Sequence, residues 1–130
     1  MSKISVLYVD DEENNLFSFK ANFRLKYKVH TAISGKDALE ILKKEAIDII
    51  ITDQRMPEMT GVEFLEKVID INAEPMRILL TGYTDMGAVI DAVNKGKIFH
   101  YLTKPWNESE LDETIQRAYQ IYQNHKSCYG

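Results

Sequence analysis

Four consecutive acidic residues, Asp10 to Glu13, follow directly after an apolar run at residues 4–9. Like charges this close together repel one another, so such a cluster calls for protonation, exposure to solvent or a bound cation. Further residues with polar or reactive groups come at or just after the ends of other short apolar runs: Asp53, Thr81 and Lys104. Few kinds of binding or catalytic site use carboxylates, a hydroxyl and an ammonium together.

Metal-dependent phosphoryl transfer uses this combination of groups. Two or three carboxylates can hold a hard divalent cation, and Mg²⁺ fits best because it keeps its waters and accepts phosphate oxygens. A carboxylate can also be the nucleophile, and Asp53 is the candidate because it stands alone, whereas Asp10 and Asp11 are paired for the metal. The ammonium of Lys104 and the hydroxyl of Thr81 can stabilise charge on the transferring oxygens.

Short apolar runs alternate with longer amphipathic segments along the whole chain. Five runs are rich in strand-forming residues and predict strands at residues 4–9, 28–32, 47–52, 77–81 and 98–102. Apolar residues at helical spacing predict helices within residues 16–25, 38–46, 62–69, 89–93 and 111–122. This alternation predicts an α/β fold, a doubly wound five-stranded parallel sheet with helices on both faces.

Such a fold would bring the polar residues together although they span most of the chain. In an open parallel sheet, ligands gather at the C-terminal ends of the strands, near a switch in strand order. The acids, Thr81 and Lys104 all come at predicted strand ends, so we expect them to converge on one edge. The run "IDIIIT" has no polar alternation, which predicts a strand buried on both sides.

Composition narrows the class of protein. A chain of 130 residues with 45% hydrophobic and 28% charged residues suits one globular domain. The net charge of −4, with acids and bases interspersed, argues against direct nucleic-acid binding, which favours clustered Lys and Arg. A single cysteine, Cys128, suits a reducing compartment, and neither a secretory leader nor a long apolar run is present. We therefore expect a cytoplasmic protein with no membrane segment.

Four motifs carry a resemblance to a known family. They are "LYVDDEENN", "IIITDQRMPEMTG", "RILLTGYTD" and "FHYLTKPW", each in order and at the end of a predicted strand. Together they resemble the receiver domain of two-component response regulators, the chemotaxis-regulator-like family, over residues 3–122. The resemblance implies the flavodoxin-like (βα)5 receiver fold.

The resemblance also implies roles for the acids. Asp53 would be the phosphoacceptor, Asp11 would bind Mg²⁺ directly, and Asp10 would act through a water molecule. Asp53 would share in the metal site, and Arg55 would contribute its backbone carbonyl to the metal.

A second group of residues would contact the phosphoryl group or respond to it. By resemblance, Thr81 and Lys104 would contact the phosphoryl oxygens, and Tyr101 would be the aromatic switch residue. The resemblance further implies a cis peptide bond between Lys104 and Pro105. Packing in the core or at its rim is the alternative role for Tyr101.

The lifetime of an aspartyl phosphate depends on a water held in line with the breaking bond. The residues best placed to hold it lie two positions after the phosphoacceptor and the switch threonine, here Arg55 and Tyr83. An acid or amide there could orient the water, but Arg stays charged and Tyr is a weak acceptor. We therefore expect Arg55 and Tyr83 to lengthen the phosphorylated lifetime.

The function predicted from the resemblance is a signalling switch. It would take a phosphoryl group from a sensor histidine kinase or phosphotransfer protein and change the face formed by its fourth helix, fifth strand and fifth helix. This face would also permit a homodimer. The chain would not be an enzyme beyond assisting its own phosphorylation and dephosphorylation. We expect a receiver domain at residues 1–124 and a tail at 125–130 that begins a linker to an output domain in a longer protein.

Three rival functions can be weighed on the same residues. A haloacid-dehalogenase-like phosphatase would need a second Asp two residues after Asp53, where Arg55 stands. A flavodoxin-like cofactor binder would need free amides facing a phosphate after the first strand, where "DDEEN" would repel it. A receiver-like interaction module that works without phosphorylation stays open.

Overall fold

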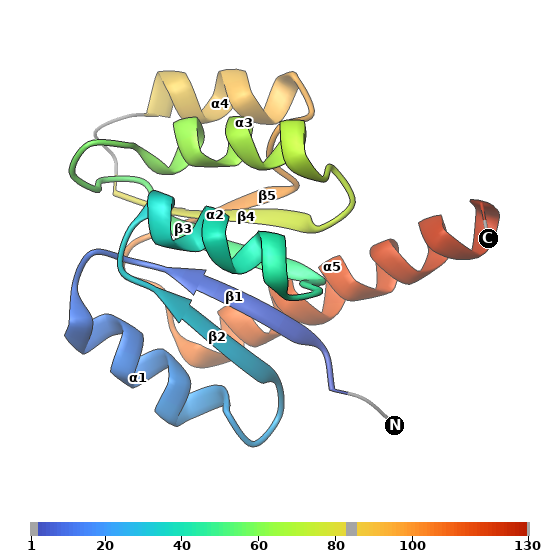
Figure 1. Cartoon of the computed structure of the whole chain (residues 1–130), viewed down its shortest axis with the longest axis horizontal. Helices are drawn as coiled ribbons and strands as arrows, with labels where there is room; N and C mark the ends of the chain where they lie inside the picture. Colours follow the sequence, from blue (N-terminus) through green and yellow to red (C-terminus); the bar gives the residue numbers. More distant parts are fainter. Residues whose placement is uncertain (1–2, 83–85, 130) are drawn as a thin grey trace.

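Five parallel strands form one sheet in the computed structural model, which describes residues 3–82 and 86–129. The strands are β1 (Ser5–Val9), β2 (Lys28–Ala32), β3 (Ile49–Asp53), β4 (Met76–Thr81) and β5 (His100–Thr103). Their order across the sheet is β2-β1-β3-β4-β5 (Figure 1). The order therefore changes direction at the pair β1 and β3, which is where ligands gather in such sheets.

Five helices connect and flank these strands in the described part of the chain: α1 (Glu13–Phe23), α2 (Gly35–Lys44), α3 (Gly61–Ile71), α4 (Met86–Asn94) and α5 (Glu108–Tyr129). Residues of α2, α3 and α4 pack in one hydrophobic cluster, and residues of α1 and α5 in a second cluster on the other face. Because both faces are covered, β1 and β3 are buried along their full length. The predicted doubly wound α/β fold is confirmed.

The first or last residues of several strands and helices differ from the prediction. Strand pairing and helix caps set these residues, and composition alone does not reveal either. Strand β5 begins at His100 and reaches Thr103, which pairs with the last residue of β4. Asp53 is the last residue of β3, although we expected it just after the strand. Leu25 and Ala46 lie beyond the helices in which we expected them, and Leu25 is 80% exposed.

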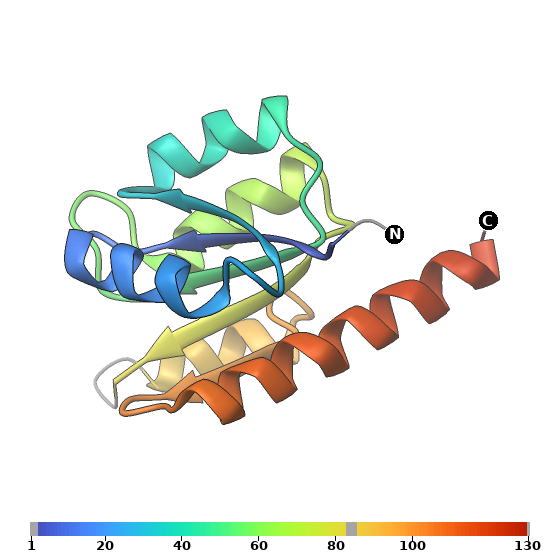
Figure 2. The same cartoon turned by 90° about the horizontal axis from the view of Figure 1, so that it is seen from below.

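Helix α5 continues to Tyr129, so it includes residues 125–129 of the expected tail. No Gly or Pro interrupts the chain between Glu108 and Tyr129, so nothing in this segment breaks the helix. Its C-terminal part extends away from the sheet (Figure 2). Among the helices that the structure describes, none combines the length and apolar character needed to span a bilayer.

Candidate functional site

Three aspartates meet at the edge of the sheet where β1 and β3 end. A carboxylate oxygen of each of Asp10, Asp11 and Asp53 lies within 4.8 Å of the other two. Asp10 and Asp53 are 1% and 6% exposed, and Asp11 is more exposed than either. The structure thus brings together residues that are more than 40 positions apart in the sequence. We call Asp10, Asp11 and Asp53 the acid pocket.

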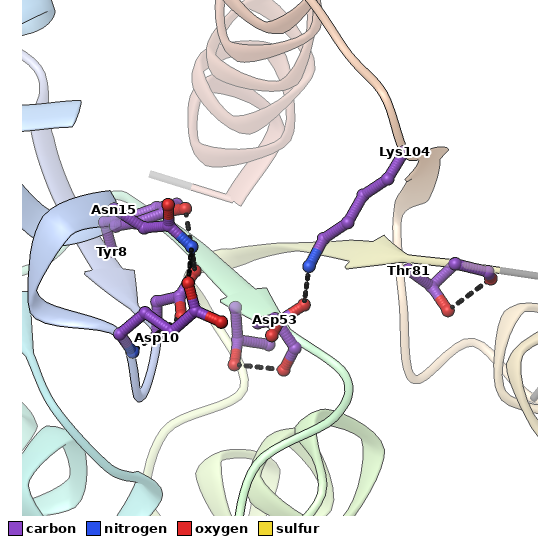
Figure 3. A network of polar contacts seen from close by, with 9 residues as sticks. Tyr8, Asp10, Asn15, Asp53, Thr81 and Lys104 are labelled. Atoms are coloured by element: carbon purple, nitrogen blue, oxygen red, sulfur yellow. Dashed lines mark hydrogen bonds and ion pairs between the residues drawn. The ribbon is translucent and has the colours of Figure 1, made fainter. Parts of the chain in front are cut away.

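Lys104 reaches the acid pocket from the loop after β5. Its Nζ lies 2.7 Å from Oδ1 of Asp53 (Figure 3). The loop is tied to the neighbouring strand because the Lys104 N–H donates to the Thr81 carbonyl at 2.9 Å. The peptide bond between Lys104 and Pro105 is cis, as the resemblance implied. These features place one ammonium against the carboxylate proposed as nucleophile.

The pKa of Asp53 is raised above its ordinary value. Burial is the main cause, and the charge of Asp10 adds to it. The hydrogen bond and charge of Lys104 lower the pKa but do not cancel the rise. The buried carboxylate therefore lacks full compensation within the protein, which favours a cation beside it.

The start of α3 fixes the backbone that follows Asp53. The Gln54 N–H donates to the Leu80 carbonyl at 3.0 Å, and the Gln54 side-chain oxygen accepts from the Val62 N–H at 2.9 Å. The Gly61 N–H donates to the Gln54 carbonyl at 3.0 Å. A Cβ atom at Gly61 would clash with the Asp53 carbonyl oxygen, so glycine allows this close approach of helix and strand.

Asp10 is held by residues that the sequence analysis did not single out. Its Oδ2 accepts hydrogen bonds from the Tyr8 hydroxyl at 3.2 Å and from Asn15 Nδ2 at 3.0 Å (Figure 3). Its Oδ1 accepts from the Glu12 N–H at 3.0 Å. Strand alternation could have indicated Tyr8, since it lies in β1 two positions before Asp10, which directly follows the strand.

A cavity of about 290 Å³ opens beside Asp10. It lies between the start of α1 and the loop after β5, and its lining is Tyr8, Asp10, Asn15, Lys104, Pro105 and Trp106. The chain's single tryptophan therefore lines the same cavity as a member of the acid pocket.

The predicted switch residues lie on neighbouring strands. Thr81 ends β4 and is 1% exposed, and its hydroxyl donates to the Gly82 carbonyl at 2.8 Å. Tyr101 is half-buried on β5, opposite Leu79, and packs on the α2–α3–α4 side of the sheet.

Of the two residues expected to set the phosphorylated lifetime, the structure describes Arg55 but not Tyr83. Arg55 is exposed in the loop after β3. Tyr83 lies outside the residues that the structure describes.

The donor set of the acid pocket fits Mg²⁺. Mg²⁺ prefers carboxylate oxygens and waters, and all three side chains offer carboxylate oxygens at close range. Among the described residues, the ion pair found in the acid pocket joins the Lys104 ammonium to Asp53, so a divalent cation would balance the remaining charge of the three carboxylates.

Comparison with known proteins identifies the family of this chain. The model of the response regulator receiver domain family matches residues 6–116. The chain is 34% identical to the hydrogenase transcriptional regulatory protein HoxA of Bradyrhizobium diazoefficiens over 122 residues, which are 94% of this chain and 25% of that protein. The chain thus spans about a quarter of the length of this relative.

Solved structures show the same fold. A structure described as adenylate cyclase from Rhodopirellula baltica matches with a TM-score of 0.95 and 32% identity, over 98% of this chain and 95% of the other. A response regulator receiver domain protein from Clostridium thermocellum matches with a TM-score of 0.87 and 31% identity, over 98% and 99%. The chain belongs to the response regulator receiver domain family.

Proposed function

We propose that this receiver domain is a signalling switch that accepts a phosphoryl group on Asp53. The observation that carries the proposal is the buried Asp53 carboxylate, paired with Lys104 Nζ at 2.7 Å and facing Asp10 and Asp11. A nucleophile, a compensating ammonium and a pair of metal-binding carboxylates are the parts that aspartyl phosphorylation requires.

The donor is a phosphohistidine on a sensor histidine kinase or a phosphotransfer protein. A carboxylate oxygen of Asp53 attacks the phosphorus, and an O–P bond forms as the N–P bond of the donor breaks. The electron pair of the broken bond stays on the imidazole nitrogen. Lys104 stabilises charge on the phosphoryl oxygens, because its ammonium already lies at the nucleophile.

Mg²⁺ would be held by Asp10, Asp11 and Asp53. Asp11 would be a direct ligand, and Asp10 would act through a water molecule. The backbone carbonyl of Arg55 would complete the site. When bound, Mg²⁺ supplies positive charge to the transferring oxygens. The support for this assignment is the close grouping of the three carboxylates and the excess of negative charge there.

Phosphorylation would then shift a population between two packed states. The Thr81 hydroxyl, now bonded to the Gly82 carbonyl, would turn to a phosphoryl oxygen, and Tyr101 would repack on the face of α4, β5 and α5. This face also offers a homodimer surface, on which Ile90 of α4 and Ile121 of α5 are 46% and 45% exposed. Arg55 and Tyr83 would lengthen the lifetime of the phosphorylated state, because they would leave the hydrolytic water without a base.

Incubation with Mg²⁺ and a small phosphodonor tests the proposal. We expect the intact mass to rise by one phosphoryl group in the wild type and not in Asp53→Ala. Asp48→Ala is the matched control. Asp48 directly precedes β3, at the other end of this strand from Asp53, and accepts a hydrogen bond there from the Ser5 N–H. Labelling that persists in Asp53→Ala would rule out Asp53 as the acceptor. No labelling of the wild type would favour the phosphorylation-independent interaction module instead.

A further inference from the structure

Tyr8 is a buried tyrosine whose hydroxyl is directed at the acid pocket. Its side chain is 2% exposed, and its ring stacks on Phe19 of α1 with centroids 4.3 Å apart and an interplanar angle of 2°. The ring of Tyr8, on β1, is therefore held by packing against α1, the helix that follows this strand. Its hydroxyl meets Asp10 Oδ2 at 3.2 Å.

The hydroxyl is the donor in this contact. The Tyr8 O–H donates to Asp10 Oδ2 at 3.2 Å, because a phenol carries the proton that a carboxylate oxygen can accept.

The three hydrogen bonds to Asp10 are distributed unequally between its oxygens. Tyr8 and Asn15 both donate to Oδ2, whereas Oδ1 receives only the Glu12 N–H among the hydrogen bonds that the described residues make. A carboxylate has about four acceptor positions, two on each oxygen. Oδ1 therefore keeps more acceptor capacity for a cation or for its bound water.

We propose that Tyr8 and Asn15 are positioning residues for metal binding, which hold Oδ2 of Asp10 and so leave Oδ1 as the oxygen that serves the cation. The inference rests on the proposed Mg²⁺-dependent function. Two donors on one oxygen fix the rotation of the carboxylate about its Cβ–Cγ bond before metal arrives. They also offset part of the repulsion between Asp10 and the other two aspartates. Loss of an outer-shell partner of this kind costs about 10-fold or more in metal affinity.

Tyr8→Phe tests this step because it removes the hydroxyl and keeps the ring and its stack on Phe19. We expect the Mg²⁺ dissociation constant to rise about 10-fold. Titration calorimetry measures it, and so does Trp106 fluorescence, since Trp106 lines the same cavity as Asp10. The Mg²⁺ concentration for half-maximal phosphorylation should rise by the same factor, with an unchanged rate at saturating Mg²⁺. Asn15→Ala should weaken Mg²⁺ binding in the same way, since it removes the second donor to Oδ2.

Tyr27→Phe is the matched control. Tyr27 is also buried, at 1% exposed, and its hydroxyl also donates to an aspartate, Asp112, which lies away from the acid pocket on α5. This variant loses the same chemical group and should keep the wild-type Mg²⁺ affinity.

Two results would overturn the inference alone: a wild-type protein that binds Mg²⁺ no more tightly than Tyr8→Phe, or equal weakening in Tyr8→Phe and Tyr27→Phe. A wild type that neither binds Mg²⁺ nor takes up a phosphoryl group would overturn the proposed function and this inference with it. A selective loss in Tyr8→Phe would support the inference.

Discussion

At the residue scale, the acid pocket concentrates more negative charge than its surroundings neutralise. Asp10 is satisfied by three hydrogen bonds and Asp53 by Lys104, but the carboxylates still repel one another at close range. At about 4 Å two charges repel by roughly 1 kcal/mol even in water, and more strongly when partly buried. The three carboxylates therefore destabilise one another, and a bound cation would relieve this repulsion.

Replacing Asp10 and Asp11 by Asn should separate these two effects. We expect Mg²⁺ affinity to fall by about 100-fold or more, because direct or water-mediated ligands contribute more than their outer partners. The free energy of unfolding without metal should rise by about 1 kcal/mol, because the repulsion is removed. Titration calorimetry and urea denaturation measure the two quantities.

Glu13→Gln is the control for this pair. Glu13 is an exposed acid in the first turn of α1 and should leave Mg²⁺ affinity unchanged. An unchanged affinity in the Asp10, Asp11 double variant would place the metal elsewhere.

At the scale of elements, the contact between α3 and β3 positions Asp53. Gly61→Ala should lower the free energy of unfolding by about 1–3 kcal/mol, because the added methyl meets the Asp53 carbonyl and the Leu79 side chain. Gly87→Ala is the matched control, since nothing lies within 4 Å of its added Cβ and the site is in α4. It should stabilise the protein by about 0.5–1 kcal/mol. Urea denaturation of both variants measures the difference, and equal effects would contradict the close approach.

A second contact between elements joins the turn after α1 to α5. Asp112 accepts from Lys26 Nζ at 2.6 Å and from the Tyr27 hydroxyl. Burial raises the pKa of Asp112, but the hydrogen bonds from Lys26 and Tyr27 outweigh it, so the pKa lies below the ordinary 3.8. The folded state therefore binds fewer protons, and the stabilisation is present above about pH 4 and is lost as the pH falls through the folded pKa.

Asp112→Asn should consequently destabilise the protein by about 1 kcal/mol at pH 7 and by less at pH 3. Urea denaturation at both pH values measures this. Asp91→Asn, which breaks an exposed pair with Lys95 on α4, should change stability by no more than about 0.5 kcal/mol at either pH. A loss for Asp112→Asn that is as large at pH 3 as at pH 7 would rule out its charge as the cause.

The composition of the short runs and the helical spacing between them predicted the elements and their order along the chain. The runs that became β1 and β3 are mostly apolar and do not alternate between polar and apolar residues, as is typical of strands covered on both faces. The ends of β5 and α1 were less predictable, since pairing with β4 and the helix cap decide them. At the site, spacing indicated the acids and Lys104, but Asn15, which donates to Asp10 from α1, depends on side-chain directions that only the fold defines.

At the scale of the whole molecule, β4 and β5 connect the acid pocket with a distant face. Thr81 ends β4, and β4 pairs with β5 so that Leu79 lies opposite Tyr101. The loop after β5 returns to the pocket, where the Lys104 N–H donates to the Thr81 carbonyl. In the proposed switch, a change at Thr81 would have a route to Tyr101 through the backbone pairing of these two strands.

Thr81→Ala tests this coupling. We expect the variant to take up the phosphoryl group about as well as the wild type, because Asp53, Lys104 and the acid pair are unchanged. It should lose most of the chemical-shift changes at Tyr101, α4 and α5, because the methyl side chain cannot donate a hydrogen bond to the phosphoryl oxygens. Thr81→Ser keeps the hydroxyl and should retain these changes. Heteronuclear NMR spectra with and without phosphodonor measure them, and identical distant changes in Thr81→Ala and wild type would show that the signal reaches this face by another route.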